Sequence, residues 1–160
     1  MPLYLKNGEY NILFIKRTES VRTHKGQIAF PGGGYEAADR TLLKTALREC
    51  AEEIGLAADK VEVLGELDDE PSLTSNYVIS PFVGIIPWPY PFMADGTETE
   101  EIIEIPIKAL LSVKENNKEL SNGDTADSYS FNYEGRIIWG ATARILSKFL
   151  EIWAQASEDK

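Results

Sequence analysis

The sequence predicts an α/β or α+β fold built on a mixed β-sheet. Short apolar segments of strand character are interspersed with two longer segments in which apolar residues recur at helical spacing. Asn-Gly and Glu-Gly pairs and several prolines separate these segments, as turn residues between elements do. The elements do not alternate regularly between strand and helix, so we do not expect a doubly wound sheet.

A hairpin is predicted at the start of the chain. Residues 10–17 (YNILFIKR) have the composition of a strand, and the Asn-Gly pair at 7–8 is a turn signal that could close a hairpin with residues 3–6. A second strand is expected at 27–30. Pro31 should end it because proline cannot donate to a sheet ladder.

The first long helix is expected between Asp39, a plausible N-cap, and Gly55, which is well placed as a left-handed terminator. Apolar residues recur at helical intervals between them: Leu43, Ala46, Leu47, Cys50, Ala51 and Ile54. This face should be buried, and the glutamates of the same segment should lie on another face.

Further strands are predicted at 61–67 and 77–86, separated by the acidic segment 68–71. The second is apolar enough to lie inside a sheet. Residues 88–99 are rich in proline and aromatic residues, which indicates a loop, and a short strand is expected at 102–105.

The C-terminal part of the chain should close the fold. Its expected elements are a short helix at 106–113, a polar loop at 116–127, a hairpin of strands 128–133 and 136–138, and an amphipathic helix at 141–153.

Length and composition indicate one domain. The 160 residues suit a single domain, residues 1–160, with a polar C-terminal tail at about 155–160. The formal charge of −10 argues against non-specific binding to nucleic acid or to anionic membranes. The single cysteine, Cys50, excludes an internal disulfide and a multi-cysteine metal site. We find no secretion signal and no membrane anchor, and we expect a cytoplasmic protein.

Three glutamates on the first long helix suggest a metal site. At roughly 100° per residue, Glu49, Glu52 and Glu53 point into one sector of the helix. Carboxylates so placed repel each other, and a hard cation such as Mg²⁺ or Mn²⁺ would relieve the repulsion. The alternative is a solvated acidic helix face, which is the usual fate of a charge run.

The segment 34–56 resembles the Nudix box, whose pattern is G x5 E x7 R E U x E E x G U, where U is aliphatic. The matching positions are Arg48, Glu49, Glu52, Glu53, Gly55 and Leu56. Cys50 takes an aliphatic position, and Arg40 stands where the pattern has glutamate, with Asp39 beside it.

The flanks resemble the coenzyme A diphosphatase branch of the Nudix hydrolases. The run ILFIKRTESVRTHKGQIAFPGG at 12–33 precedes the box, and in that branch an acidic residue falls nine positions before the arginine, as Asp39 does here. Later segments agree with the branch: YVISPFVGIIP at 77–87, EIPIKALL at 104–111 and IWGATARIL at 138–146.

This resemblance implies a Nudix-type α/β/α sandwich and a hydrolase that uses Mg²⁺ or Mn²⁺ to cleave a nucleoside diphosphate linked to another group. In this branch the substrate would be coenzyme A or an acyl derivative, cleaved to 3′,5′-ADP and 4′-phosphopantetheine or its acyl form. Glu49, Glu52 and Glu53 would then hold the metal. The partner would be a small nucleotide, and the chain could act alone or as a homodimer.

The resemblance also suggests catalytic roles. Arg48 would orient a glutamate through a charge-assisted hydrogen bond, and the alternative for it is a surface ion pair. The general base is left open between Glu53 and Glu98, which lies in the loop before the strand at 102–105 and aligns with an acidic position of the family.

Substrate binding is assigned to two groups of residues. The basic side chains of the coenzyme A-like motif could bind phosphates: Arg17, Arg22, His24 and Lys25. The backbone amides of Gly32, Gly33 and Gly34 could approach a phosphate closely because glycine has no Cβ. His24 could instead be a loop residue hydrogen-bonded to the backbone, and Gln27 could belong to a sheet edge.

Aromatic residues allow two interpretations. They could stack on adenine or line an acyl path, but such residues belong to the core more often. The residues concerned are Tyr77, Trp88, Tyr90 and Phe92.

Two other functions remain open. One is Nudix hydrolysis of ADP-ribose, a nucleotide sugar or a dinucleotide, against which the segment RTESVRTHKGQ at 17–27 argues. The other is a Nudix module that binds a nucleotide without cleaving it. Loss of the metal-binding glutamates would mark such a module, and all three are present.

Overall fold

The computed structural model describes residues 1–20, 24–73, 75–120 and 130–158. Within these residues the centre of the fold is a six-stranded sheet. Five strands follow the order β3-β2-β1-β7-β4, and β8 also pairs with β2. The strands are β1 (Pro2–Lys6), β2 (Glu9–Arg17), β3 (Ile28–Ala29), β4 (Glu62–Glu66), β7 (Phe82–Ile85) and β8 (Thr99–Pro106). Because β1 and β7 are parallel and the other pairs antiparallel, the sheet is mixed, as predicted.

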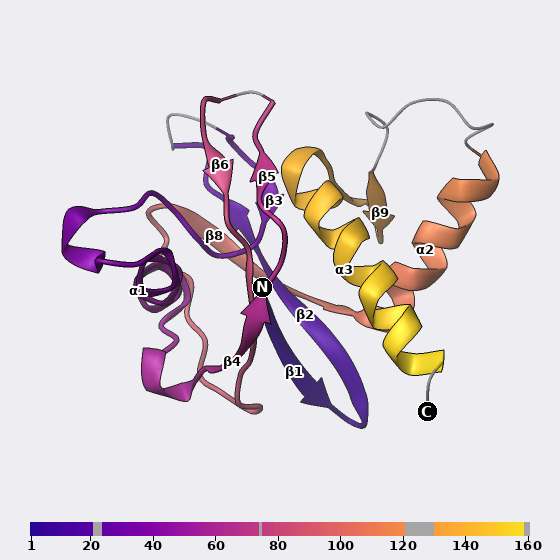
Figure 1. The fold of residues 1–160 in the computed structure, drawn as a ribbon, viewed down its shortest axis with the longest axis horizontal. Coiled ribbons are helices and arrows are strands. Elements are labelled where there is room, and N and C mark those ends of the chain that lie inside the picture. The colour runs from indigo at the N-terminus through magenta and orange to yellow at the C-terminus, as the bar shows by residue number, and fades with distance from the viewer. Residues whose placement is uncertain (21–23, 74, 121–129, 159–160) are drawn as a thin grey trace.

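Helices cover both faces of this sheet (Figure 1). One face carries α1 (Leu42–Ile54), and the other carries α2 (Ile107–Leu120) and α3 (Gly140–Glu158). Side chains alternate along β2, so that Ile12 and Phe14 join the core under α2 and α3 whereas Leu13 and Ile15 join the core on the α1 side. The predicted α/β/α sandwich is therefore confirmed.

Both predicted hairpins are present. The β1–β2 turn has positive φ at Asn7 (52°) and Gly8 (81°), which suits a two-residue turn matched to the strand twist. Glu134 and Gly135 adopt the same kind of backbone between β9 (Phe131–Tyr133) and β10 (Arg136–Ile138).

The start of α1 differs from the sequence prediction, whereas its end agrees. Thr41, not Asp39, is the N-cap, because the Thr41 hydroxyl accepts a hydrogen bond from the Lys44 amide. Asp39 ends a short 3₁₀ turn, η1 (Ala37–Asp39), and its carboxylate is engaged by side chains of α1 instead. Gly55 closes the helix at φ 70° as predicted.

The expected strand at 77–86 is divided in two. Val78–Ile79 (β6) leaves the main sheet to pair with Glu70–Pro71 (β5), so the acidic segment that was expected only to separate two strands contributes a strand itself. Pro81, which lacks an amide hydrogen, stands between β6 and β7. Only β7 occupies the expected interior position, between β1 and β4.

Three C-terminal elements are longer than predicted. Helix α2 continues to Leu120, so residues 116–120 of the expected polar loop are helical, and 121–127 lie outside the described residues. Lys, Glu and Leu are good helix formers, which explains how a polar segment continues the helix. Strand β8 begins at Thr99, and α3 extends through most of the expected polar tail to Glu158.

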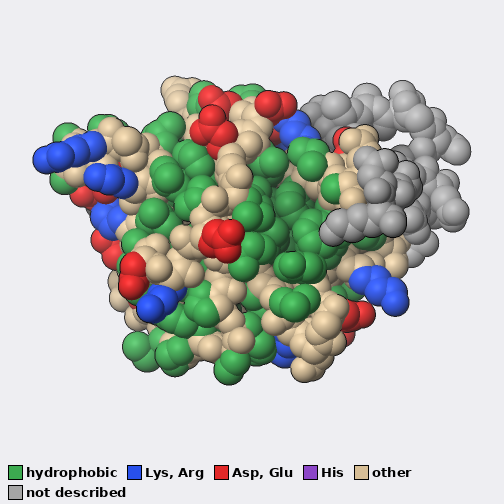
Figure 2. Space-filling view, turned by 60° about the horizontal axis from the view of Figure 1, so that its bottom comes forward, with side chains coloured by type: hydrophobic (Ala, Val, Ile, Leu, Met, Phe, Trp, Pro, Cys, Tyr) green, Lys and Arg blue, Asp and Glu red, His purple; other side chains and the backbone are tan. Residues whose placement is uncertain are grey.

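The surface is not uniformly charged. Figure 2 shows a face on which hydrophobic side chains gather in the middle and charged side chains lie mostly towards the margins. Among the helices that the structure describes, none combines the length and apolar character needed to cross a membrane.

Candidate active site

Four segments meet at one end of α1. They are the end of β2, the glycine-rich turn at 32–34, the glutamate face of α1, and the loop that precedes β8. Backbone hydrogen bonds join three of them: the Thr18 amide donates to the Glu98 carbonyl at 2.9 Å, and the Asp95 amide donates to the Glu53 carbonyl at 3.2 Å. Sequence-distant candidates are thereby brought into one place.

Glu53 is a buried carboxylate with one oxygen unused. Its residue is 3% exposed, and Oε2 accepts a hydrogen bond from the Gly32 amide at 2.9 Å. Oε1 is buried and has no hydrogen-bond partner among the described residues. Burial, with a smaller contribution from the charges of Glu49 and Glu98, raises the pKa of Glu53 to about 7. A free, buried carboxylate oxygen is what a metal ligand or a base requires.

Glu49 lies against the glycine-rich turn. Burial raises the pKa of this carboxyl group, although Arg48 opposes the shift. A Cβ atom at Gly33 would overlap the Glu49 carboxylate, coming within 2.8 Å of Oε2. Glycine at this position therefore lets the turn and the helix approach each other.

Arg48 connects the turn, η1 and two glutamates of α1. Its guanidinium donates to Glu49 Oε1 at 2.9 Å, to Glu52 Oε2 at 3.0 Å and to the Gly34 carbonyl at 3.0 Å. It also donates twice to Asp39, from Nε at 2.9 Å and from Nη2 at 3.2 Å. The guanidinium is fixed from several sides.

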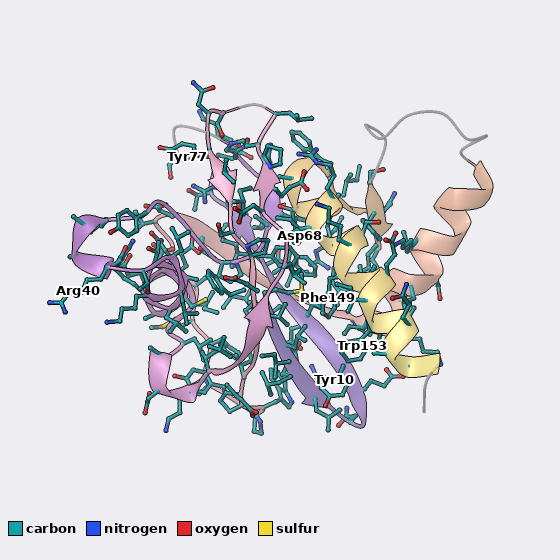
Figure 3. The ribbon with its side chains drawn as sticks, in the orientation of Figure 1. Tyr10, Arg40, Asp68, Tyr77, Phe149 and Trp153 are labelled. Carbon is teal, nitrogen blue, oxygen red and sulfur yellow. The ribbon has the colours of Figure 1, made fainter. Side chains whose placement is uncertain are left out.

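Asp39, which accepts two of the Arg48 hydrogen bonds, is itself buried and held in place. It is 6% exposed, and it accepts further hydrogen bonds from the Thr45 hydroxyl at 2.8 Å and the Glu36 amide at 3.0 Å. The hydrogen bonds from Arg48 hold the pKa of Asp39 well below its usual range. Arg40, which stands at the box position of glutamate, is exposed at φ 64° and points away from the fold (Figure 3).

Arg17 faces two carboxylates from the end of β2. Its guanidinium lies 3.9 Å from Glu53 Oε1 and 3.6 Å from Glu98 Oε2. Both oxygens of Asp95 accept a hydrogen bond from the Glu98 amide at 3.2 Å, which fixes the backbone at Glu98. The Glu98 side chain is 57% exposed and reaches the site from the solvent side.

No hydrogen bond or ion pair joins the other described candidate residues to Glu53. Glu52 is at the exposed rim and contacts Arg48. His24 Nδ1 lies 3.0 Å from Gln27 Oε1, Lys25 is exposed, and Arg22 lies outside the described residues. Gln27 immediately precedes β3, and its carbonyl accepts a hydrogen bond from the Arg17 amide at 2.9 Å.

Three of the four aromatic candidates belong to the core. Trp88, Tyr90 and Phe92 pack on the α1 side, and the Trp88 ring stacks on Tyr4 at 4.8 Å between centroids. Tyr77 is 70% exposed on the segment that joins β5 to β6 (Figure 3). The core interpretation therefore describes all but Tyr77.

The sequence reasoning missed Asp95 and Thr45 as supports of the site. The Asp-Gly pair at 95–96 is a turn signal that could have identified Asp95. No comparable local signal marks Thr45, because its hydroxyl acts on Asp39 only after η1 folds against α1.

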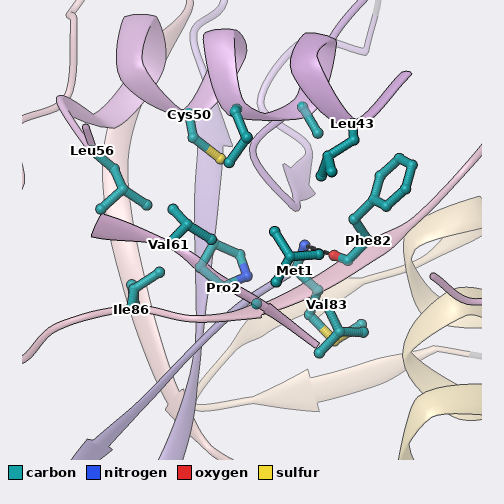
Figure 4. Close-up of a pocket in the computed structure, with 13 residues that line it drawn as sticks. Met1, Pro2, Leu43, Cys50, Leu56, Val61, Phe82, Val83 and Ile86 are labelled. Carbon is teal, nitrogen blue, oxygen red and sulfur yellow. Dashed lines mark hydrogen bonds between the residues drawn. The ribbon is translucent and has the colours of Figure 1, made fainter. Parts of the chain in front are cut away.

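An apolar pocket lies between the half-buried apolar face of α1 and strands β4 and β7 (Figure 4). Its lining includes Leu43, Cys50, Val61 and Phe82 and contains no carboxylate. Burial raises the pKa of the Cys50 thiol to about 11, so the thiol stays protonated and unreactive at neutral pH. The pocket is distinct from the group formed by Glu49, Glu53 and Glu98, which we call the carboxylate cluster.

The carboxylate cluster has the donor chemistry of a divalent-metal site. Glu53 offers an unpartnered buried oxygen, and Glu49 and Glu98 are close enough to raise the pKa of Glu53. As the side chains stand, no three Asp, Glu, His or Cys groups among the described residues converge on one point. Arg48 and Arg17 pair with these carboxylates instead.

Comparisons with known proteins identify one family. Residues 2–126 match the family described as NUDIX domain. The uncharacterized Nudix hydrolase NudL of Yersinia pestis (strain Pestoides F) is 37% identical over 140 residues, which are 86% of this chain and 70% of that protein.

Solved structures agree on the fold. The NUDIX domain of Shewanella oneidensis NrtR complexed with ADP ribose has a TM-score of 0.55 at 15% identity, over 75% of this chain and 84% of that chain. A C. elegans Ap4A hydrolase binary complex has a TM-score of 0.58 at 12% identity, over 94% and 93%. Since the family match covers most of the sequence, the chain belongs to the Nudix hydrolase family.

Proposed function

We propose that this Nudix diphosphatase hydrolyses coenzyme A or acyl-coenzyme A to 3′,5′-ADP and 4′-phosphopantetheine or its acyl form, using Mg²⁺ or Mn²⁺. The position of Arg17 carries the proposal. Arg17 belongs to the segment that resembles the coenzyme A diphosphatase branch, and its guanidinium faces Glu53 and Glu98. Arg17 of the coenzyme A-like motif thus lies beside the carboxylate cluster.

Metal binding is assigned to Glu49, Glu52 and Glu53. A bound Mg²⁺ or Mn²⁺ would neutralise the diphosphate and make water a better nucleophile. Arg48, which donates to both Glu49 and Glu52, would orient these two side chains.

The roles of Glu53 and Glu98 follow from which oxygens are free. Glu53 has one oxygen committed to the Gly32 amide, so a single oxygen remains to bind a metal or a proton. If that oxygen binds the metal, the base must be another group. Glu98 is exposed to solvent and lies next to Arg17. We therefore assign metal binding to Glu53 and proton abstraction from water to Glu98.

Phosphate binding is assigned to the turn and to the basic motif. The Gly32 amide donates to Glu53 Oε2, so within the turn the amides of Gly33 and Gly34 would contact phosphate, and a Cβ at Gly34 would meet open space. Arg17 is the motif's cation beside Glu53, whereas His24 and Lys25 lie on the turn that leads to β3. Together they would bind the nucleotide end of the substrate.

The remaining expectations concern localisation, partners and oligomeric state. We expect a cytoplasmic enzyme whose partner is a small nucleotide and not a nucleic acid or a membrane. It would act as a monomer or a homodimer.

A substrate panel tests the proposal. Purified protein is incubated with Mg²⁺ or Mn²⁺ and coenzyme A, acetyl-coenzyme A, ADP-ribose, NADH or a nucleotide sugar, and the products are identified by mass. The proposal expects the highest kcat/KM for coenzyme A or acetyl-coenzyme A, with release of 3′,5′-ADP. A preference for ADP-ribose would contradict the substrate assignment and leave the diphosphatase chemistry intact.

A further inference from the structure

The two arginines beside the site carboxylates are held very differently. Arg48 donates hydrogen bonds to three carboxylates and a carbonyl group. The Arg17 side chain makes no hydrogen bond to any described residue: its nearest acidic oxygens are 3.9 and 3.6 Å away, and its buried Nε has no partner. Arg48 is therefore fixed in place, whereas no hydrogen bond from the described part of the chain holds the Arg17 guanidinium.

The unmet hydrogen bonds of Arg17 occur in a poorly hydrated place. Its side chain is only 19% exposed, and Glu53 beside it is 4% exposed. A guanidinium group withdrawn from water normally gains hydrogen bonds in return, and here it gains only Coulomb attraction. The arrangement suits a cation that neutralises nearby carboxylates but is available to another acceptor.

A metal ion and Arg17 would compete for the same oxygen. Glu53 Oε1 is the unpartnered oxygen of the cluster and also the oxygen that Arg17 faces. A divalent cation there would repel the guanidinium, which could then donate to the anionic phosphates of a substrate.

We infer that Arg17 is a displaceable counter-ion, which neutralises Glu53 and Glu98 while no divalent ion is bound and turns to the substrate phosphates when the ion takes its place. The inference rests on the proposed metal site. It makes Arg17 a positioning residue for the metal-free cluster and a phosphate ligand in the loaded enzyme.

This double role gives removal of Arg17 two effects of opposite sign. The metal should bind more tightly, because no cation must be displaced. A nucleotide diphosphate should bind more weakly once metal is present, because a phosphate donor is lost. Removal of a residue with a merely structural role would weaken both metal binding and nucleotide binding.

The test measures Mn²⁺ binding by electron paramagnetic resonance, starting from metal-free protein. Arg17→Gln should bind Mn²⁺ about tenfold more tightly than wild type, which corresponds to about 1.4 kcal/mol. Lys16→Gln is the matched control, because Lys16 is the neighbouring cation and pairs with Glu100 at 3.2 Å, away from Glu53. Lys16→Gln and the charge-conserving Arg17→Lys should both stay near the wild-type affinity.

The second effect, weaker nucleotide binding, is measured by isothermal titration calorimetry with ADP as the probe in saturating Mg²⁺. Arg17→Gln should bind ADP about tenfold more weakly, as expected for loss of a charged phosphate donor. Unchanged or weaker Mn²⁺ binding by Arg17→Gln would overturn the inference. If Glu53→Gln loses Mn²⁺ binding in the same series, the proposed metal site stands even where the Arg17 inference fails. A wild-type protein that binds no Mn²⁺ would overturn both the metal site and the Arg17 inference.

The wild-type protein offers a test that needs no substitution. In ¹⁵N NMR spectra of arginine side chains, addition of Mg²⁺ should move the Nε–H signal of Arg17 more than that of Arg48, because Arg48 Nε donates to Asp39, which is not an assigned metal ligand. A fixed Arg17 signal at saturating Mg²⁺ would overturn the inference.

Discussion

Asp39 accepts two hydrogen bonds from Arg48, one from Nε to Oδ1 at 2.9 Å and one from Nη2 to Oδ2 at 3.2 Å. This pair gives Arg48 an acidic partner although the glutamate of the Nudix box pattern is absent. The box glutamate is replaced by the exposed Arg40, and the acidic residue one position earlier is buried against Arg48. Because Arg48 also contacts Glu49 and Glu52, Asp39 helps to set the positions of both glutamates.

The first prediction concerns this pair. Asp39→Asn should lower kcat/KM by roughly 10- to 100-fold, the usual effect of removing a group that orients metal ligands. Arg40→Glu is the matched control. Because Arg40 is exposed, restoring the box glutamate there should change kcat/KM by no more than about twofold. The pair would lose its assigned role if Asp39→Asn kept wild-type activity while remaining folded by circular dichroism.

The second prediction concerns the close approach of the glycine-rich turn to α1. Gly33→Ala places a methyl group against the Glu49 carboxylate and should displace that side chain. Activity should fall by roughly 10- to 100-fold, because small displacements of catalytic groups have large effects. Gly65→Ala is the control, since a Cβ at Gly65 meets open space. Equal activity of the two variants would show that the turn tolerates the displacement.

The third prediction concerns the stability of the metal-free protein. Burial raises the pKa of Glu53 from 4.5 to about 7, so between these values the folded protein binds more protons at this residue than the unfolded chain. The free energy of unfolding should therefore decrease as pH rises through this window, with a contribution of about 3 kcal/mol from Glu53, and level off above it.

Urea denaturation in EDTA at several pH values between 5 and 8 measures this effect. Glu53→Gln cannot titrate, so the wild-type protein should lose more stability than the variant across the window, and Glu53→Gln should be the more stable protein at pH 8. Parallel pH profiles of the two proteins would contradict the burial of an ionisable Glu53.

Local patterns in the sequence predicted much of the fold. The hairpin turn at Asn7-Gly8 and the helix end at Gly55 need positive φ, and the residues that favour it are visible in the sequence. The spacing of Glu49, Glu52 and Glu53 likewise specifies a shared helix face. The loop predicted at residues 116–120 was wrong because their polarity was considered and their helix propensity was not. The single strand predicted at 77–86 was wrong because Pro81 interrupts the apolar run.

Contacts between distant segments could not be obtained in this way. Arg17 and Glu53 meet because β2 pairs with β8, with a shift of register between Lys16 and Arg17, and because the loop before β8 bonds to the end of α1. Nothing near Arg17 in the sequence indicates that its guanidinium faces a buried carboxylate. The local N-cap preference of Asp39 was misleading for the same reason, because a bond to Arg48 decides its position.

The turnover of Glu53→Gln tests whether Glu53 takes part in metal-assisted hydrolysis. The measurement is kcat at saturating Mg²⁺ on the best substrate of the panel, with circular dichroism to verify folding. The account predicts a folded variant whose kcat falls by at least about 100-fold, because the free buried oxygen no longer carries charge. A folded Glu53→Gln variant with near-wild-type kcat would contradict it.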